Sequence, residues 1–80
     1  MTDEVILEFY SPSCASCKVV DRILSRNERV VRVNVEIETE KTSYFAVTRL
    51  PTVIVMDKSR IRERIEGVGP EQLAKIVSLA

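Results

Sequence analysis

The pattern of hydrophobic and polar positions divides the first half of the chain into three elements. Residues 5–10 form a nearly continuous apolar run, typical of a strand buried on both faces. From residue 14 to about residue 26 the apolar positions follow the helical period, and Ser13 is a candidate N-cap. Residues 31–37 alternate valine and isoleucine with polar side chains, which predicts a second strand. A strand, a helix and a strand with short links form a right-handed parallel βαβ unit.

The next part of the chain predicts a short helix followed by a hairpin. Residues 39–48 are expected to be helical, with Tyr44, Phe45 and Val47 as their apolar content. Residues 52–56 form the third strand, with a proline at its entry. After a short turn, residues 60–66 alternate isoleucine with charged side chains, as an edge strand does. The short link predicts that these two strands form a hairpin.

The last element is a helix that begins at Pro70, a residue suited to the first helical position. Its buried face is expected to comprise Leu73, Ile76, Val77 and Ala80. The predicted fold is therefore α/β, in the order β-α-β-α-β-β-α. A chain of 80 residues predicts a single domain, residues 1–80.

Composition and charge exclude several classes of protein. Twelve basic residues balance twelve acidic ones, so the chain offers no electrostatic footprint for nucleic acid or for an anionic membrane. No apolar run approaches the roughly 18 residues that a membrane span needs. The acidic residues near the N-terminus, residues 1–4, are unlike a secretory signal. We therefore expect a cytoplasmic protein that binds neither nucleic acid nor a membrane.

The two cysteines, Cys14 and Cys17, carry the candidate chemistry. Cysteines three residues apart cannot staple distant parts of a fold. The chain has no histidine and so lacks the four ligands that a mononuclear zinc site usually needs. Three interpretations remain: redox chemistry, a metal shared between two chains, and incidental thiols.

The position of the cysteine pair favours redox chemistry. The pair lies where a buried strand leads into a helix, and residues three apart there have Cα atoms roughly 5–6 Å apart, within disulfide range. The helix N-terminus favours the thiolate of its first cysteine, and the thiolate is the attacking species in disulfide exchange. We therefore expect Cys14 to be the exposed nucleophile and Cys17, on the apolar stripe, to be the buried resolving thiol.

With these elements in place, the chain resembles the thioredoxin-like superfamily over nearly its whole length. The matching segments are VILEFYSPSCASCK, RVNV, VTRLPTVIVM and GVGPEQL, at residues 5–18, 32–35, 47–56 and 67–73. The resemblance implies a thioredoxin-like fold with a four-stranded mixed sheet in the order second, first, third, fourth. It also implies that the third strand runs antiparallel to the first, and that helices flank both faces.

The resemblance further implies a substrate-binding role for Leu50, Pro51 and Gly67. A cis Leu50–Pro51 peptide bond would lie beside the cysteine pair, and the Leu50 backbone would pair with an extended segment of the substrate. Leu50 would add an apolar contact. Gly67 would let the substrate backbone approach closely, although it is also explained as an ordinary turn glycine.

Glu8 has two possible roles. It falls where thioredoxins place a buried acid, usually aspartate, behind the resolving cysteine. In that family the acid moves a proton to or from the thiol, and burial raises its pKa toward the useful range. Arg32 falls where thioredoxins often place a lysine beside the acid, so a structural Glu8–Arg32 ion pair is the alternative.

The resemblance implies a thiol–disulfide oxidoreductase that works through a mixed disulfide and needs no cofactor. We expect protein disulfides as substrates, a separate thioredoxin-reductase-like enzyme or a small thiol as the electron source, and a monomer. Ala15 and Ser16 replace the usual residues between the cysteines, so the subfamily stays open. The alternatives are a glutaredoxin-like reductase that uses a low-molecular-weight thiol, and a non-enzymatic binding module with a metal site between chains.

Overall fold

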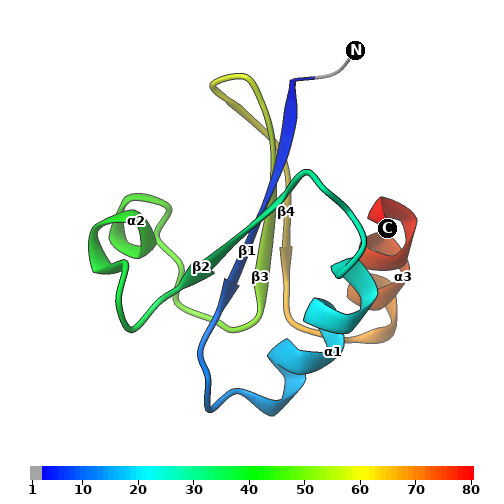
Figure 1. The fold of residues 1–80 in the computed structure, drawn as a ribbon, viewed down its shortest axis with the longest axis horizontal. Helices are drawn as coiled ribbons and strands as arrows, with labels where there is room; N and C mark the ends of the chain where they lie inside the picture. The colour runs from blue at the N-terminus through cyan, green and yellow to red at the C-terminus, as the bar shows by residue number, and fades with distance from the viewer. Residues whose placement is uncertain (1–2) are drawn as a thin grey trace.

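The computed structural model describes residues 3–80 and places helices on both faces of a four-stranded sheet (Figure 1). The elements in chain order are β1 (Glu4–Tyr10), α1 (Ala15–Leu24), β2 (Val30–Asn34), α2 (Thr39–Tyr44), β3 (Thr52–Asp57), β4 (Arg60–Glu66) and α3 (Pro70–Leu79). This order of elements is the one that the sequence predicts. None of the helices within residues 3–80 combines the length and the apolar character that a membrane span requires.

The sheet has the strand order β2-β1-β3-β4, as the resemblance implied. β1 runs parallel to β2, with Phe9 opposite Val33, and antiparallel to β3, with Phe9 opposite Thr52. β4 pairs antiparallel with β3 and forms an edge of the sheet. Because β1 and β3 run in opposite directions, the end of β1 and the start of β3 meet at the same end of the sheet.

Each face of the sheet carries its own hydrophobic cluster. α1 and α3 lie together over one face, and α2 lies on the opposite side (Figure 1). The cluster under α1 and α3 consists of Ile6, Val20, Leu24, Val53, Val55, Ile65 and Ile76. The cluster on the other face consists of Leu7, Phe9, Val33 and Ile54, with Phe45, Val47 and Leu50 packed against it. Successive residues of β1 point to opposite faces, so its continuous apolar run supplies both clusters.

The N-cap of α1 is Cys14, and the expectation that Ser13 caps this helix is wrong. Cys14 has an extended backbone (φ −89°, ψ 107°), and its Sγ accepts a hydrogen bond from the Cys17 N–H. The Ser13 hydroxyl lies instead 3.1 Å from the Ser11 hydroxyl. The chain therefore begins its helix one residue later, with a sulfur atom in the place of the usual capping oxygen.

β2 ends at Asn34, three residues earlier than the alternating pattern predicts. The Asn34 side-chain oxygen accepts a hydrogen bond from the Glu36 N–H at 2.9 Å, and the Asn34 carbonyl accepts from the N–H groups of Ile37 and Glu38. These bonds form an Asx-type turn that leads the chain out of the sheet. Ile37 lies outside the strand and is 76% exposed, so its inclusion in the second strand was predicted wrongly.

α2 ends at Tyr44 instead of Thr48. Ala46 has a φ of 51°, in the left-handed region that interrupts a helix. Arg64 of β4 donates hydrogen bonds to the carbonyl oxygens of Phe45 and Ala46, at 2.6 and 2.8 Å. These contacts fasten the end of α2 to the sheet, and Tyr44 remains in solvent.

The buried face of α3 is centred on Ile76, as predicted, but it does not include Val77 or Ala80. Both of these side chains are exposed, whereas Leu73 and Leu79 are half-buried. Val77 follows Ile76 by about 100° around the helix axis, which turns its side chain away from the sheet.

Ile54 lies in the core and Ile61 does not, so an isoleucine-to-valine substitution should change the free energy of unfolding by different amounts at the two positions. Ile54→Val should lower the free energy of unfolding by about 1 kcal/mol, because it removes a methylene group from a fully buried site. Ile61 also lies in a strand but is 51% exposed, so Ile61→Val should change the free energy of unfolding by less than about 0.5 kcal/mol. Urea denaturation measures both values, and equal losses would contradict this core.

Candidate functional site

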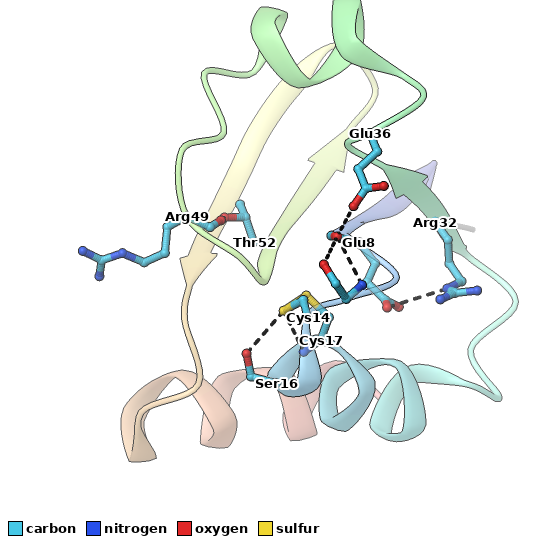
Figure 2. The surroundings of a disulfide bond; sticks show 10 residues. Glu8, Cys14, Ser16, Cys17, Arg32, Glu36, Arg49 and Thr52 are labelled. Carbon is cyan, nitrogen blue, oxygen red and sulfur yellow. Dashed lines mark hydrogen bonds and ion pairs between the residues drawn. A yellow bond between two sulfur atoms is a disulfide. The ribbon is translucent and has the colours of Figure 1, made fainter.

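Cys14 and Cys17 form a disulfide at the start of α1 (Figure 2). Their Cα atoms lie 5.3 Å apart. Cys14 is partly exposed, whereas only 3% of Cys17 is exposed. Another molecule can therefore reach Cys14 more easily than Cys17.

Two hydrogen-bond donors lie close to the Cys14 sulfur. The Cys17 N–H is 3.2 Å away, and the Ser16 hydroxyl is 3.4 Å away (Figure 2). The hydroxyl is the donor in this pair because a disulfide sulfur carries no hydrogen. Together with the dipole of α1, these donors favour negative charge on Cys14 when the disulfide is opened.

The loop before the cysteine pair is tied to the loop after β2. The Ser11 hydroxyl donates a hydrogen bond to Glu36 Oε2 at 2.5 Å. The Ser11 carbonyl accepts a hydrogen bond from the Cys14 N–H at 3.1 Å. Glu36, labelled in Figure 2, therefore helps to hold the turn that presents Cys14, a contact that the sequence analysis did not predict.

Leu50, Pro51 and Gly67 lie at the same end of the sheet as the cysteine pair. The Leu50–Pro51 peptide bond is cis, as the resemblance implied, and Pro51 is buried. Pro51 directly precedes Thr52, which lies opposite Phe9, and its carbonyl accepts a hydrogen bond from the Gly67 N–H at 2.9 Å. Strand register therefore brings three segments that are far apart in the sequence to one place.

These residues also have structural reasons to be present. Leu50 is half-buried against the Phe9 cluster. Gly67 has a φ of 90°, a conformation that other residues rarely adopt. The buried Thr52 hydroxyl donates a hydrogen bond to the Arg49 carbonyl at 2.5 Å, at the entry to β3 (Figure 2). Thr52, which the sequence analysis passed over, thus orders the turn that contains Leu50 and Pro51.

Glu8 is a buried carboxyl on β1, with only 1% of its surface exposed. Neither carboxylate oxygen has a hydrogen-bond partner among the described residues. Arg32 of β2 lies 3.8 Å from Glu8 Oε2, within ion-pair range, and Figure 2 shows this contact. The same Arg32 Nε lies closer, at 2.8 Å, to Asp21 Oδ1. The Glu8–Arg32 pair therefore exists, but Arg32 is engaged more closely with Asp21.

The surroundings of Glu8 raise its pKa from the ordinary value of 4.5 to about 7. The main cause is burial, because removal from water penalises the charged carboxylate. The negative charge of Asp21 raises the pKa further, while the positive charge of Arg32 opposes both effects. Glu8 is therefore a carboxyl group that gains and loses its proton near neutral pH, the range that suits general acid–base work.

Asp21 is the charged neighbour that the sequence analysis missed. It lies on α1 four residues after Cys17, so the two side chains share one side of the helix. This spacing is the signal that could have identified it. It borders the buried stripe of Val20 and Leu24, where a charged residue is easily taken for part of the solvated face.

The cysteine pair has no metal-binding cluster beside it in the described part of the chain. Within residues 3–80, no group of three or more His, Cys, Asp or Glu side chains is arranged to hold a metal ion. A surface hollow of about 700 Å³ lies over residues 37–45, beside α2 and away from the cysteines.

Comparison with known proteins decides the family. The model of the thioredoxin family matches residues 1–79. The chain belongs to the thioredoxin family. It is 29% identical over 83 aligned positions to the thioredoxin of Mycoplasma pneumoniae, which covers 96% of this chain and 79% of that protein. It is 27% identical over 81 positions to the thioredoxin of Mycoplasma genitalium, covering 94% of this chain and 78% of that protein.

A solved structure supports the thioredoxin fold. The oxidised form of mitochondrial thioredoxin 3 from Saccharomyces cerevisiae superposes with a TM-score of 0.80 at 23% identity. The match covers 98% of this chain and 79% of that one. The fold class expected from the sequence is thereby confirmed.

Family membership and the Cys14–Cys17 disulfide make this thioredoxin family member a thiol–disulfide oxidoreductase. Thioredoxins act on protein disulfides and are themselves reduced by a reductase. The enzyme class predicted from the sequence is confirmed.

The raised pKa of Glu8 predicts how folding stability depends on pH. Between pH 4.5 and about 7 the unfolded chain releases the Glu8 proton while the folded chain keeps it, so stability falls as pH rises. Glu8→Gln removes the titrating carboxyl group and, with it, this pH-dependent loss of stability. The variant should gain stability relative to the wild type between pH 4.5 and 8, by on the order of 3 kcal/mol.

Urea denaturation of the oxidised protein across this pH range measures the effect. Glu40→Gln, at an exposed position on α2, controls for the loss of a carboxylate elsewhere. A stability difference between Glu8→Gln and wild type that stays constant with pH would contradict the raised pKa.

Proposed function

We propose that this protein reduces protein disulfides, with Cys14 as the attacking thiolate and Cys17 as the resolving thiol. The unequal exposure of the two cysteines carries the proposal. Cys14 is partly exposed and has two donors beside its sulfur, whereas Cys17 is 3% exposed. An incoming disulfide therefore meets Cys14 first.

The proposed reaction has two exchange steps. The Cys14 thiolate attacks one sulfur of the substrate disulfide, a Cys14–substrate bond forms, and the other substrate sulfur leaves as a thiolate that takes a proton from water. Cys17 then gives up its proton, and its sulfur attacks Cys14. The second substrate sulfur leaves and is protonated in turn. The substrate gains two electrons, and the protein is left with the Cys14–Cys17 disulfide.

Glu8 is proposed to accept the Cys17 proton in the second step. Its burial and its pKa of about 7 support this role, because a general base works best when its pKa lies near the working pH. The closeness of Arg32 to Asp21 leaves Glu8 without a strong ion pair, which argues against a purely structural role.

The substrate is proposed to lie in extended form beside Leu50, Pro51 and Gly67. This proposal is supported by their place at the cysteine end of the sheet. Gly67 has no side chain to obstruct a second backbone, and a segment that pairs with the Leu50 backbone would add a short strand.

We also propose that the protein works as a reductant in the cytoplasm, where thiols are kept reduced. The presence of only two cysteines, both in the reactive pair, supports this direction. A separate reductase would restore the dithiol after each turnover. The disulfide closes within one chain, so the proposed chemistry requires no second copy.

Substitutions of the two cysteines should have different effects in a test of insulin-disulfide reduction. Cys14→Ser should lower the rate to that of the uncatalysed control, because no nucleophile remains. Cys17→Ser should accumulate a mixed disulfide on Cys14, because nothing resolves it. Mass spectrometry of the intact protein detects the adduct, and each variant serves as the matched control for the other. Wild-type activity in both variants would overturn the proposal.

The electron source is tested separately. Wild-type turnover is compared with a flavin-dependent thioredoxin reductase and with glutathione as the reductant. We expect turnover with the reductase. Turnover with glutathione alone would instead assign the glutaredoxin-like activity that the sequence analysis kept as an alternative.

A further inference from the structure

The guanidinium of Arg32 lies between the carboxylates of Asp21 and Glu8 and is closer to Asp21. Asp21 Oδ1 is 2.8 Å from Arg32 Nε, and the same nitrogen is 3.8 Å from Glu8 Oε2. The Arg32 guanidinium also stacks over the Tyr10 ring, with its carbon 4.1 Å from the ring centre. Arg32 is thus held on one side by an aromatic face and on another by Asp21, and both contacts limit its approach to Glu8.

The three ionisable groups differ sharply in their access to water. The side chains of Arg32 and Asp21 are 47% and 41% exposed, whereas that of Glu8 is 1% exposed. The buried carboxyl of Glu8 therefore takes its charged surroundings from Asp21 and Arg32, which lie nearer to the solvent.

Asp21 and Arg32 lie in the walls of two small hollows, one beside Cys17 and the other beside Glu8. Cys17 and Lys18 line a hollow of about 80 Å³, and Glu8 lines a second hollow of about 180 Å³. Asp21 and Arg32 line both of them. These two side chains consequently contribute to the surroundings of both Cys17 and Glu8.

Few other charges bear on Glu8 within the described residues. The charged groups placed against it are Asp21 from α1 and Arg32 from β2. Lys18, at the rim of the first hollow, is exposed. β3 and α3 present the apolar Val53 and Ile76 to the cluster on this face of the sheet. The loss of the Asp21 carboxylate would therefore make the surroundings of Glu8 more positive.

We propose that Asp21 is a positioning residue for proton transfer at Cys17. It restrains Arg32 and sets a negative charge beside Glu8, so that the Glu8 carboxylate accepts a proton more readily. This inference rests on the role proposed above for Glu8. As the Cys17–Cys14 bond forms and the Cys14–substrate bond breaks, the Cys17 proton passes to the Glu8 carboxylate. Glu8 later releases this proton to water.

The first test follows the Glu8 carboxyl directly by ¹³C NMR in the oxidised protein. In Asp21→Asn, the pKa of Glu8 should fall by roughly one pH unit, because a repelling charge is lost and Arg32 is freed to pair with Glu8. Asp57→Asn, at an exposed position at the end of β3, is the matched control and should leave the titration where it is. Asp21→Glu should restore most of the wild-type value. An unchanged titration in Asp21→Asn would overturn the proposal.

The second test asks whether the effect reaches the chemistry. The rate at which the mixed disulfide resolves is measured across pH 5–9 for wild type, Asp21→Asn and Glu8→Gln. We expect the midpoint of the wild-type profile to move to lower pH in Asp21→Asn and to disappear in Glu8→Gln. If Glu8→Gln keeps the wild-type profile, the proton-acceptor role of Glu8 fails. If only Asp21→Asn keeps it, the role of Asp21 fails and that of Glu8 stands.

Discussion

The antiparallel pairing of β1 with β3 is the constraint on which the site depends. It places Phe9 opposite Thr52, so the strand that leads to Cys14 ends where the strand after Pro51 begins. The hydrogen bond from the Gly67 N–H to the Pro51 carbonyl then adds the end of β4 to the same place. A register shift of one residue would turn every β1 side chain to the opposite face and disperse this arrangement.

The same register explains why a carboxyl group lies in the core. β1 directs Ile6 and Glu8 toward α1, while Leu7 and Phe9 face the other cluster. Glu8 is therefore buried by its position in a strand whose apolar neighbours decide the packing. Burial of an ionised carboxylate at this position is energetically unfavourable. The pKa of Glu8 is therefore raised to about 7, so that the neutral form is populated near neutral pH.

Local hydrogen bonds mark the points where the chain departs from its hydrophobic pattern. Asn34 ends β2 through its own side chain, although the alternation of valine and isoleucine continues beyond it. Arg64 binds the carbonyl groups after α2 from a strand that is distant in the sequence. Glu36 holds Ser11 in a similar way beside the cysteine pair. Such contacts shape the loops around the site, and periodicity carries no information about them.

The sequence by itself determined the order of the elements, the strand at residues 5–10, and a reactive pair at a helix start, because hydrophobic period and cysteine spacing are local properties of the chain. The resemblance extended this to the sheet order and to Pro51. Only the tertiary structure decided that Cys14 caps its own helix, and that Arg32 lies closer to Asp21 than to Glu8. Those outcomes depend on distances between α1, β1 and β2, and such distances are set by how the helix packs on the sheet.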